Sequence, residues 1–257
     1  MFVNKKSDDF VGILTINRPE TLNAMNPDVL QEIDKSVNDF IKDEKIGVII
    51  LTGEGEKSFI AGADIKIMQQ LDHKGALKFG KLGQKVTLTI ENSPKPIIAA
   101  VNGFALGGGC EISLACHIRF VSDDAKFAQP EVKLGLIPGW GGTQRLPKIV
   151  GKGIATELII GGQIIDAQEA YRIGLANKVF PSKNLMEESV KFAKSIINNG
   201  PNSITQSLNC INKSFENTLI EGLDMEAKTF SKLFKTKETI EGLTAFVEKR
   251  KANFRPK

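Results

Sequence analysis

The apolar positions in the first half of the chain follow two spacings, one typical of buried strands and one typical of helices. Short runs of consecutive apolar residues bounded by turn residues predict strands. These runs lie at residues 11–16, 47–52, 96–101 and 118–122. The first strand is expected to pair with the opening residues of the chain through a turn at residues 7–9.

Between the strands, apolar residues recur three and four positions apart, which is helical spacing. The clearest helix starts at Asn26-Pro27, since Asn is a good N-cap and Pro suits the first helical position. Its apolar face contains Val29, Leu30, Ile33, Val37, Phe40 and Ile41. A second helical stretch covers residues 75–91. Buried strands separated by helices predict an α/β fold with parallel strands and crossover connections.

The second half of the chain is almost wholly helical from about Gly142 onward. We expect an α/β core over residues 1–195 that carries any functional site, followed by a helical C-terminal region over residues 196–257. That region carries an apolar stripe formed by Leu219, Leu223, Phe230, Leu233 and Phe234. The stripe can pack against the core or make contacts between subunits, and the pattern leaves both open.

Composition narrows the class of protein. The 257 residues are 41% hydrophobic and 25% charged, with a formal net charge of +4, which is ordinary for a globular protein. No apolar run is long enough to span a bilayer, and the opening residues lack the core of a signal peptide. Three cysteines show neither metal-ligand spacing nor an even disulfide set, so we expect a cytoplasmic protein.

A glycine-rich segment, Gly107-Gly108-Gly109-Cys110-Glu111, is the first candidate for chemistry. It follows a predicted strand and opens a helix. Glycines there let a ligand approach free backbone N–H groups and the positive end of the helix dipole, which favours an oxygen with negative charge. Glu111 follows Gly108 by about one helical turn. Tight packing of the glycines and a solvated Glu111 are the simpler interpretations of this segment alone.

Two further segments carry polar residues between stiff or small neighbours. Glu131 follows a proline in a loop, and the nearby loop of residues 138–142 combines proline, glycine and the single tryptophan, Trp140. The segment Ala61-Gly-Ala-Asp64 forms a small-residue turn, and Asp64 is expected to cap the helix that follows it.

These segments together resemble the crotonase (enoyl-CoA hydratase) family. The resemblance rests on motifs that occur in the family's order along nearly the whole chain. They are Ala61-Gly-Ala-Asp64, Asn102-Gly followed by Gly107-Gly-Gly-Cys-Glu111, Gln129-Pro-Glu131, and Gly141-Gly-Thr-Gln-Arg-Leu146. The resemblance implies a spiral of ββα units with a helical C-terminal oligomerisation region, assembled as trimers paired into a hexamer.

The resemblance also implies roles for individual residues. The N–H groups of Ala63 and Gly108 match an oxyanion hole for a thioester carbonyl, and Glu111 and Glu131 match the acid–base pair. Positions that match the binding site for coenzyme A (CoA) are Ala61, Asp64, Ile65, Lys66, Phe230 and Lys249, the last two reaching a neighbouring subunit's site. The implied reaction adds water to a 2-enoyl-CoA thioester, with no cofactor besides the CoA of the substrate.

The chemistry of two carboxylates suits this reaction, because one can accept a proton from water while the other donates one. We expect Glu131 to protonate C2 and Glu111 to activate the hydroxyl, and the reverse assignment stays open. His73 and His117 are the only histidines and lack ligand partners in the sequence, so no metal is expected.

Three alternatives remain at this point. An enoyl-CoA isomerase would need one base, and the second glutamate argues against it. An RNA-binding member of the fold would need a basic stripe, but the only dense cluster is Lys249-Arg250-Lys251. A CoA-binding scaffold without turnover conflicts with the paired glutamates. Two departures from the family pattern, Ala128 and His117, fall outside the catalytic positions.

Overall fold

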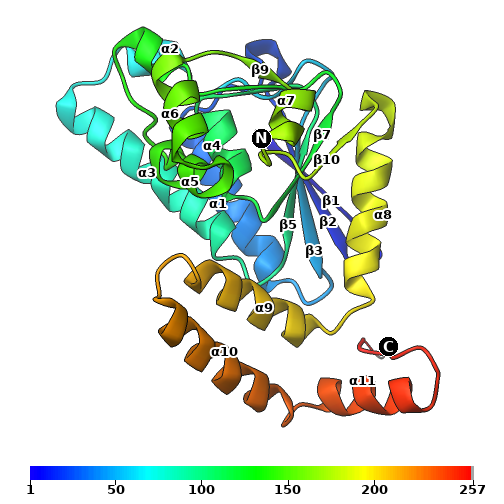
Figure 1. Ribbon diagram of the computed structural model, residues 1–257. Helices are drawn as coiled ribbons and strands as arrows, with labels where there is room; N and C mark the ends of the chain where they lie inside the picture. The colour runs from blue at the N-terminus through cyan, green and yellow to red at the C-terminus, as the bar shows by residue number, and fades with distance from the viewer. Residues whose placement is uncertain (256–257) are drawn as a thin grey trace.

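The computed structural model describes residues 1–255 as an α/β core above a layer of three C-terminal helices (Figure 1). The main sheet has six strands in the order β1-β2-β3-β5-β7-β10. Its members are β1 (Val3–Asp8), β2 (Val11–Ile16), β3 (Val48–Gly53), β5 (Ile97–Val101), β7 (Ile118–Ser122) and β10 (Lys178–Phe180). All neighbours are parallel except β1 and β2, which form a hairpin. The predicted α/β class with parallel strands is confirmed.

The hairpin turn lies slightly later than expected. β1 continues to Asp8, and the turn is formed by Asp9 and Phe10, whose φ angles are 46° and 64°. Two consecutive residues with positive φ match the right-handed twist of a two-residue hairpin. The turn predicted at residues 7–9 was therefore misplaced, because the polar residues at the end of β1 look like a turn in sequence.

Both faces of the main sheet are covered. On one face, α1 (Pro27–Lys42) and α3 (His73–Glu91) pack over residues such as Leu14, Ile49 and Ala99. On the other face, α8 (Leu185–Ile197) covers Val48, Ile50, Ile98 and Phe120. Asn26 caps α1 by accepting a hydrogen bond from Val29 N, as its sequence predicts. Burial on both faces explains why these strands are continuous apolar runs.

A second, smaller sheet positions the candidate site. Its four strands, in spatial order, are β4 (Ser58–Ile60), β6 (Phe104–Leu106), β8 (Lys126–Ala128) and β9 (Ile165–Asp166). Sequence analysis did not predict these strands, because two or three residues are too few to show a strand periodicity. The sheet joins the segments that carry the three motifs, which are far apart along the chain.

Shorter helices surround this sheet. They are the 3₁₀ turns η1 (Pro19–Thr21), η2 (Glu131–Leu134) and η3 (Ser182–Asn184), and the helices α2 (Ile65–Met68), α4 (Gly108–Ala115), α5 (Gly142–Val150), α6 (Lys152–Gly161) and α7 (Ala167–Arg172). Asp166 caps α7 by accepting from Glu169 N.

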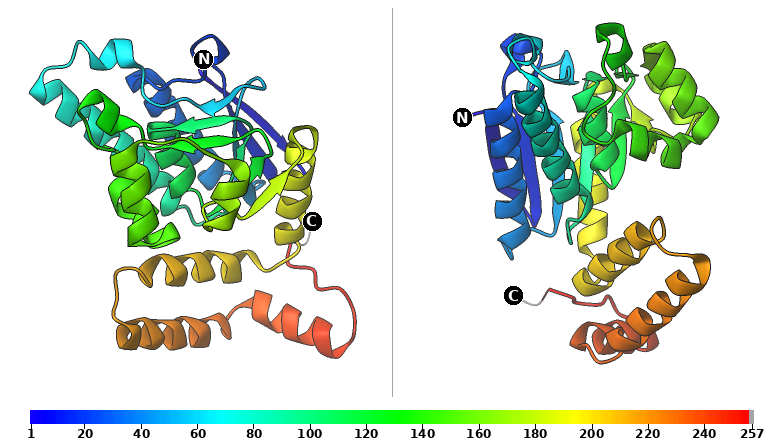
Figure 2. Two further views of the ribbon diagram at one scale, coloured as in Figure 1. Left: turned by 45° about the horizontal axis from the view of Figure 1, so that its top comes forward. Right: turned by 90° about the vertical axis from the view of Figure 1, so that its left-hand side faces the viewer.

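The C-terminal region consists of α9 (Pro201–Lys213), α10 (Leu219–Leu233) and α11 (Lys237–Val247). Both views in Figure 2 show these helices as a separate layer at one end of the core. Side chains of α9 donate hydrogen bonds to the core. Thr205 donates to the carbonyl of Pro94 and Asn212 to the carbonyl of Glu91, both at 2.7 Å. The region is helical as predicted, and the domain boundary expected at residue 195 falls in the last turn of α8. None of the helices within residues 1–255 is long and apolar enough to cross a membrane.

Candidate active site

The start of α4 lies at a tight turn that exposes a backbone N–H group. Gly107 has a φ of 50°, and its own N–H donates to the carbonyl of Ala128 at 2.9 Å. Gly108 is the first residue of α4, so its N–H has no carbonyl acceptor within the helix. The dipole of α4 adds a partial positive charge at the same point. A negatively charged oxygen is therefore favoured beside Gly108.

The turn at residues 61–63 lies against the start of α4. A Cβ atom built on Gly62 would lie 3.1 Å from the carbonyl oxygen of Leu106 and 4.0 Å from the nitrogen of Gly108. The N–H groups of Ala61 and Asp64 donate to carbonyls of Leu22 and Met25. Within residues 1–255, the N–H of Ala63 has no backbone acceptor. The structure thus brings Ala63 and Gly108, the two expected oxyanion-hole residues, into neighbouring turns.

Glu111 is almost fully buried on α4, with 2% of its surface exposed. Its Oε1 atom accepts hydrogen bonds from the backbone N–H groups of Trp140 and Gly142, each at 2.7 Å. Burial raises the pKa of Glu111, and the N–H groups of Gly142 and Trp140 oppose this rise because they stabilise the charged form. Glu111 is thus a buried carboxylate with two dedicated donors.

Glu131 approaches the same turn from η2, immediately after β8. A Cβ atom built on Gly107 would lie 2.7 Å from Glu131 Oε1, so a side chain at position 107 would displace this carboxylate. Partial burial is the main cause that raises the pKa of Glu131 to about 7, and the carboxylate of Glu111 raises it further. The two glutamates therefore titrate differently, and each influences the other.

The expected CoA-contact residues divide into two groups. Asp64 caps α2 by accepting from Lys66 N and pairs with Arg18 at 2.9 Å, while Ile65 is about half exposed. These residues and Ala61 lie beside Ala63 at the site. Phe230 on α10 is 63% exposed, and Lys249 follows α11. Within one chain, Figure 1 shows α2 and the C-terminal helices at opposite ends of the molecule, so the structure does not bring the two groups together.

Sequence analysis missed the groups that hold Glu111. The loop of residues 138–142 was recognised as unusual, but its role as a hydrogen-bond donor depends on backbone atoms that carry no sequence signal. The ring of Trp140 is buried between α3 and α4, where it packs edge-on against Phe79 at 5.3 Å and fills the space beside Gly83 and Gly108.

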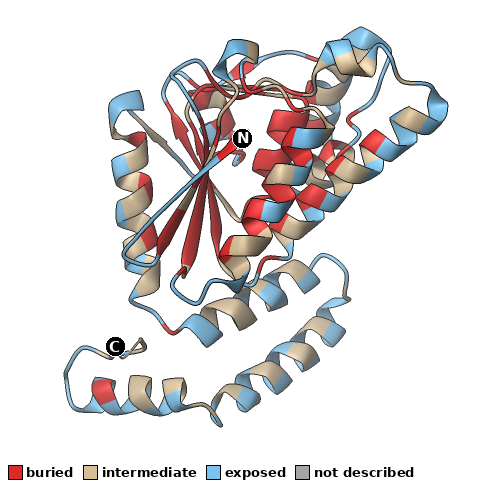
Figure 3. Cartoon of the chain, turned by 180° about the vertical axis from the view of Figure 1, so that it is seen from behind, coloured by how far each residue is buried: buried red, intermediate tan, exposed pale blue. Residues whose placement is uncertain are grey.

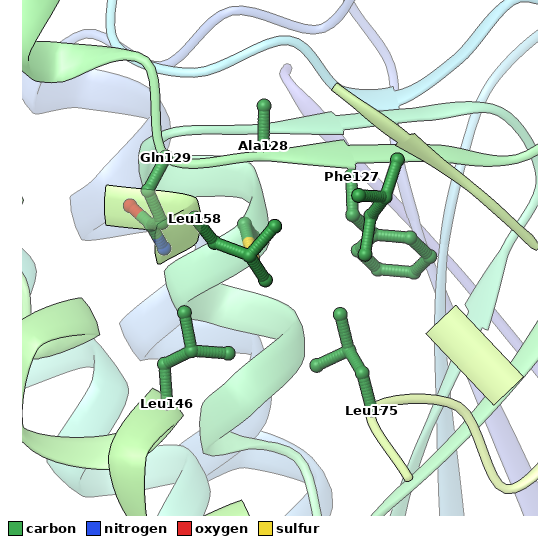
Figure 4. A pocket seen from close by; sticks show the side chains of 8 residues that line it. Phe127, Ala128, Gln129, Leu146, Leu158 and Leu175 are labelled. Carbon is green, nitrogen blue, oxygen red and sulfur yellow. The ribbon is translucent and has the colours of Figure 1, made fainter. Parts of the chain in front are cut away.

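A small void lies behind the site (Figure 4). Leu146, Leu158, Leu175 and Phe127 line it, and the side chain of Gln129 borders the same space. Its volume is about 10 Å³, which holds roughly one water molecule. The void is a packing feature of the core and has no room for an acyl chain.

No group of three or more His, Cys, Asp or Glu side chains within residues 1–255 is arranged to hold a metal ion. Cys110 and Cys116 are buried, and burial raises the pKa of each thiol to about 12. A thiol with such a pKa is a poor nucleophile at neutral pH. The reactive groups that the structure assembles are therefore two carboxylates and backbone N–H donors, which together can transfer protons beside an oxyanion.

Comparison with known proteins identifies the family of the chain. The family model described as enoyl-CoA hydratase/isomerase matches residues 6–257. The chain is 47% identical to crotonyl-CoA hydratase of Syntrophomonas wolfei over 97% of this chain and 96% of that protein. It is also 47% identical to short-chain-enoyl-CoA hydratase of Clostridium acetobutylicum, over 94% and 92% of the two chains.

Solved structures show the same fold. A crystal structure of enoyl-CoA hydratase from Bacillus anthracis superposes with a TM-score of 0.96 at 35% identity, covering both chains completely. A structure from Geobacillus kaustophilus described as enoyl-CoA hydratase subunit I gives 0.94 at 37% identity, covering 100% of this chain and 99% of that one. The crotonase-type fold predicted from the motifs is confirmed, and the chain belongs to the enoyl-CoA hydratase/isomerase family.

Proposed function

We propose that the protein is an enoyl-CoA hydratase that reversibly adds water to 2-trans-enoyl-CoA to give 3-hydroxyacyl-CoA. The observation that carries the proposal is the pair Glu111 and Glu131, which approach one glycine turn from different elements and differ in burial and hydrogen bonding. Family membership and the names of the two relatives reported above support the same reaction class.

The thioester carbonyl is the group that Ala63 and Gly108 would bind. Addition of a hydroxyl at C3 pushes negative charge onto the carbonyl oxygen. Two fixed N–H donors stabilise that charge as it develops, and removal of one such donor in other enzymes costs about 3–4 kcal/mol. The position of Gly108 at the start of α4 adds the helix dipole to this stabilisation.

The two carboxylates divide the proton transfers in this proposal. The N–H groups of Trp140 and Gly142 donate to Glu111 and favour its ionised form. That form suits a base that takes a proton from water as the hydroxyl attacks C3. Glu131, whose pKa is raised to about 7, can hold a proton near neutral pH and donate it to C2. In the reverse reaction the roles exchange.

The proposed CoA site includes Ala61, Asp64, Ile65 and Lys66 from the core. Phe230 and Lys249 would come from a neighbouring subunit, because they lie far from α2 within one chain. This requires an oligomer, and the family resemblance suggests a hexamer built as a dimer of trimers. The substrate supplies CoA itself, so the proposed reaction uses no separate cofactor.

The test is hydration of crotonyl-CoA, followed by the loss of the ultraviolet absorbance of the enoyl thioester. We expect Glu111→Gln and Glu131→Gln each to lower kcat by about 10²- to 10⁴-fold, because each removes one acid or base and leaves the shape of the side chain. In hydration, activity should fall as the pH rises through about 7, since Glu131 then loses the proton that it donates.

The matched control is Glu169→Gln, a change at an exposed glutamate on α7 that is paired with Arg172. It should leave kcat unchanged. Full activity in Glu111→Gln or Glu131→Gln would contradict the paired mechanism. Conversion of a 3-enoyl-CoA to the 2-enoyl isomer without hydration would favour the isomerase alternative.

A further inference from the structure

We propose that Arg145, held by Glu91, is a positioning residue that fixes the loop of residues 138–142 against Glu111 and so keeps the carboxylate of Glu111 oriented. The inference deepens the proposed function and rests on it for the role of Glu111. It concerns a pair of side chains 54 positions apart in sequence that touch none of the proposed reacting atoms.

The loop depends on fixed peptide orientations. Glu111 Oε1 accepts from Trp140 N and Gly142 N, which belong to the peptide units 139–140 and 141–142. Rotation of either peptide unit would replace an N–H donor with a carbonyl oxygen, whose negative partial charge opposes an ionised Glu111. A loop rich in glycine does not fix these orientations by itself, because glycine allows many backbone conformations.

The carbonyl of Trp140 is anchored from the opposite side. It accepts hydrogen bonds from Thr87 Oγ1 on α3 and from Arg145 Nη1 on α5, both at 3.0 Å. Gln84 Nε2 on α3 also donates to the neighbouring carbonyl of Gly139 at 3.0 Å. Gln84 thus holds the peptide unit that contains Trp140 N, and Thr87 and the positively charged Arg145 hold the next unit, 140–141, which connects it to the unit of Gly142 N.

Arg145 is itself held in one geometry. Its Nε and Nη2 atoms donate to the two carboxylate oxygens of Glu91 at 2.9 and 2.7 Å. Only 12% of the Arg145 side chain is exposed. A bidentate arginine–carboxylate pair with this little exposure is directional and stronger than an exposed ion pair. The third nitrogen, Nη1, is thereby aimed at Trp140.

The charged and titratable groups around Glu111 are Cys110 on its own helix, Glu131 from η2, and Arg145 from α5 with Glu91 from α3 behind it. The positive charge of Arg145 lowers the pKa of Glu111, which opposes the effect of burial. Loss of the guanidinium or of its orientation should therefore shift Glu111 toward its protonated form. A protonated Glu111 cannot accept a proton from water.

Trp140 provides a measurement that does not depend on activity. It is the only tryptophan in the chain, and its backbone N–H is bonded directly to Glu111. Its fluorescence can be titrated with pH in the wild type and in Arg145→Lys, Glu91→Gln and Glu111→Gln. The transition that disappears in Glu111→Gln belongs to that carboxyl group.

We expect Arg145→Lys and Glu91→Gln to move this transition to higher pH. Both should lower kcat on crotonyl-CoA by about tenfold to a hundredfold, the range expected for a misplaced catalytic group, with KM changed less than about twofold. The acidic limb of the kcat profile should move to higher pH in parallel. Glu91→Gln retains hydrogen-bonding capacity and supports the test if Arg145→Lys does not fold.

The matched control is Arg172→Gln, which removes an exposed bidentate pair with Glu169 on α7. If Arg145→Lys and Glu91→Gln resemble this control in kcat and in the fluorescence transition, the positioning role is wrong. A wild type without hydratase activity would overturn the proposed function instead, and the fluorescence titration would still decide whether Arg145 controls Glu111.

Discussion

The α/β core and the C-terminal helices differ most in how many of their apolar side chains are buried. The strands β3 and β5 are buried at every position, and the inward face of α1 is buried as well. In contrast, Ala245 is the only buried residue among positions 201–255 (Figure 3). The large apolar side chains exposed in this region include Leu219, Ile220, Phe230, Phe246 and Val247.

The seam between the two regions is also incompletely filled. A cleft of about 430 Å³ lies between them, lined by residues that include Phe10, Ile41, Pro94, Pro201 and Arg255. Burial of apolar surface is the main favourable contribution to folding, and the core supplies most of that burial. The C-terminal region leaves apolar surface available for a second chain. Most of the burial that stabilises the folded chain therefore lies in the core, whereas the exposed apolar residues of the C-terminal helices suit the proposed assembly.

The largest change in the free energy of unfolding is expected from a substitution where α4 packs against β4. A Cβ atom at Gly109 would overlap the backbone oxygen of Ile60, and backbone cannot move aside as a flexible side chain can. Gly109→Ala should lower the free energy of unfolding by at least about 3 kcal/mol, measured by urea denaturation. Gly222→Ala in α10 is the contrasting change, because a Cβ there meets nothing within 4 Å. It should be neutral or slightly stabilising, and equal losses in both variants would contradict the comparison.

A smaller change in the free energy of unfolding is expected when the pH is lowered and His117, near the seam, takes up a proton. Its Nδ1 accepts from Ile97 N at 2.9 Å, and burial lowers its pKa to about 4. Since the unfolded state binds a proton near pH 6.5, stability is full above that pH and is lost as the pH falls toward 4. Between pH 7 and 5 the loss should be about 2 kcal/mol.

The same denaturation series on His117→Asn provides the control for that prediction. Asparagine can accept the Ile97 hydrogen bond but does not titrate, so its pH dependence between 7 and 5 should be weaker by the same amount. An unchanged slope would show that His117 is not the group responsible.

The smallest effect on the free energy of unfolding of one chain is expected at Phe230, which packs edge-on against Phe234 at 5.1 Å on the surface of α10. Phe230→Glu should change it by less than about 1 kcal/mol. Sedimentation velocity should nevertheless show smaller assemblies, because a charge would enter the proposed subunit contact. Lys228→Glu changes charge on the other side of α10 and should leave assembly intact. An unaltered sedimentation coefficient in Phe230→Glu would argue against α10 as an interface.

Much of the core could be predicted because its elements are long and strictly patterned. The strand at residues 118–122 was predicted with the bounds of β7, and the capped start of α1 follows directly from Asn26-Pro27. The second sheet could not be predicted, since β4, β6 and β8 are only three residues each and gain their order from one another. Tertiary pairing, and not local periodicity, creates these strands.

In the candidate site, too, features created by tertiary contacts could not be predicted from the sequence. The resemblance pointed to Glu111, Glu131, Ala63 and Gly108 through motifs, and the structure brings these residues around one turn. The resemblance did not point to the groups that hold Glu111, because the donors are backbone atoms. Pairing of Glu91 with Arg145 was equally invisible, because charged residues at such separation have no pattern that links them. The assignment of CoA contacts to Phe230 and Lys249 stays a prediction.

The two edge strands of the main sheet have a consequence for aggregation. A free edge strand offers unpaired backbone groups to any other chain, and long apolar edges promote fibres. Here one edge is β1, which is exposed at every position after Val3 and carries Lys5 and Lys6. The other is β10, only three residues long and headed by Lys178. Charge at one edge and brevity at the other disfavour strand addition, so close contact between copies of this chain at high concentration should not convert the sheet into an extended cross-β stack.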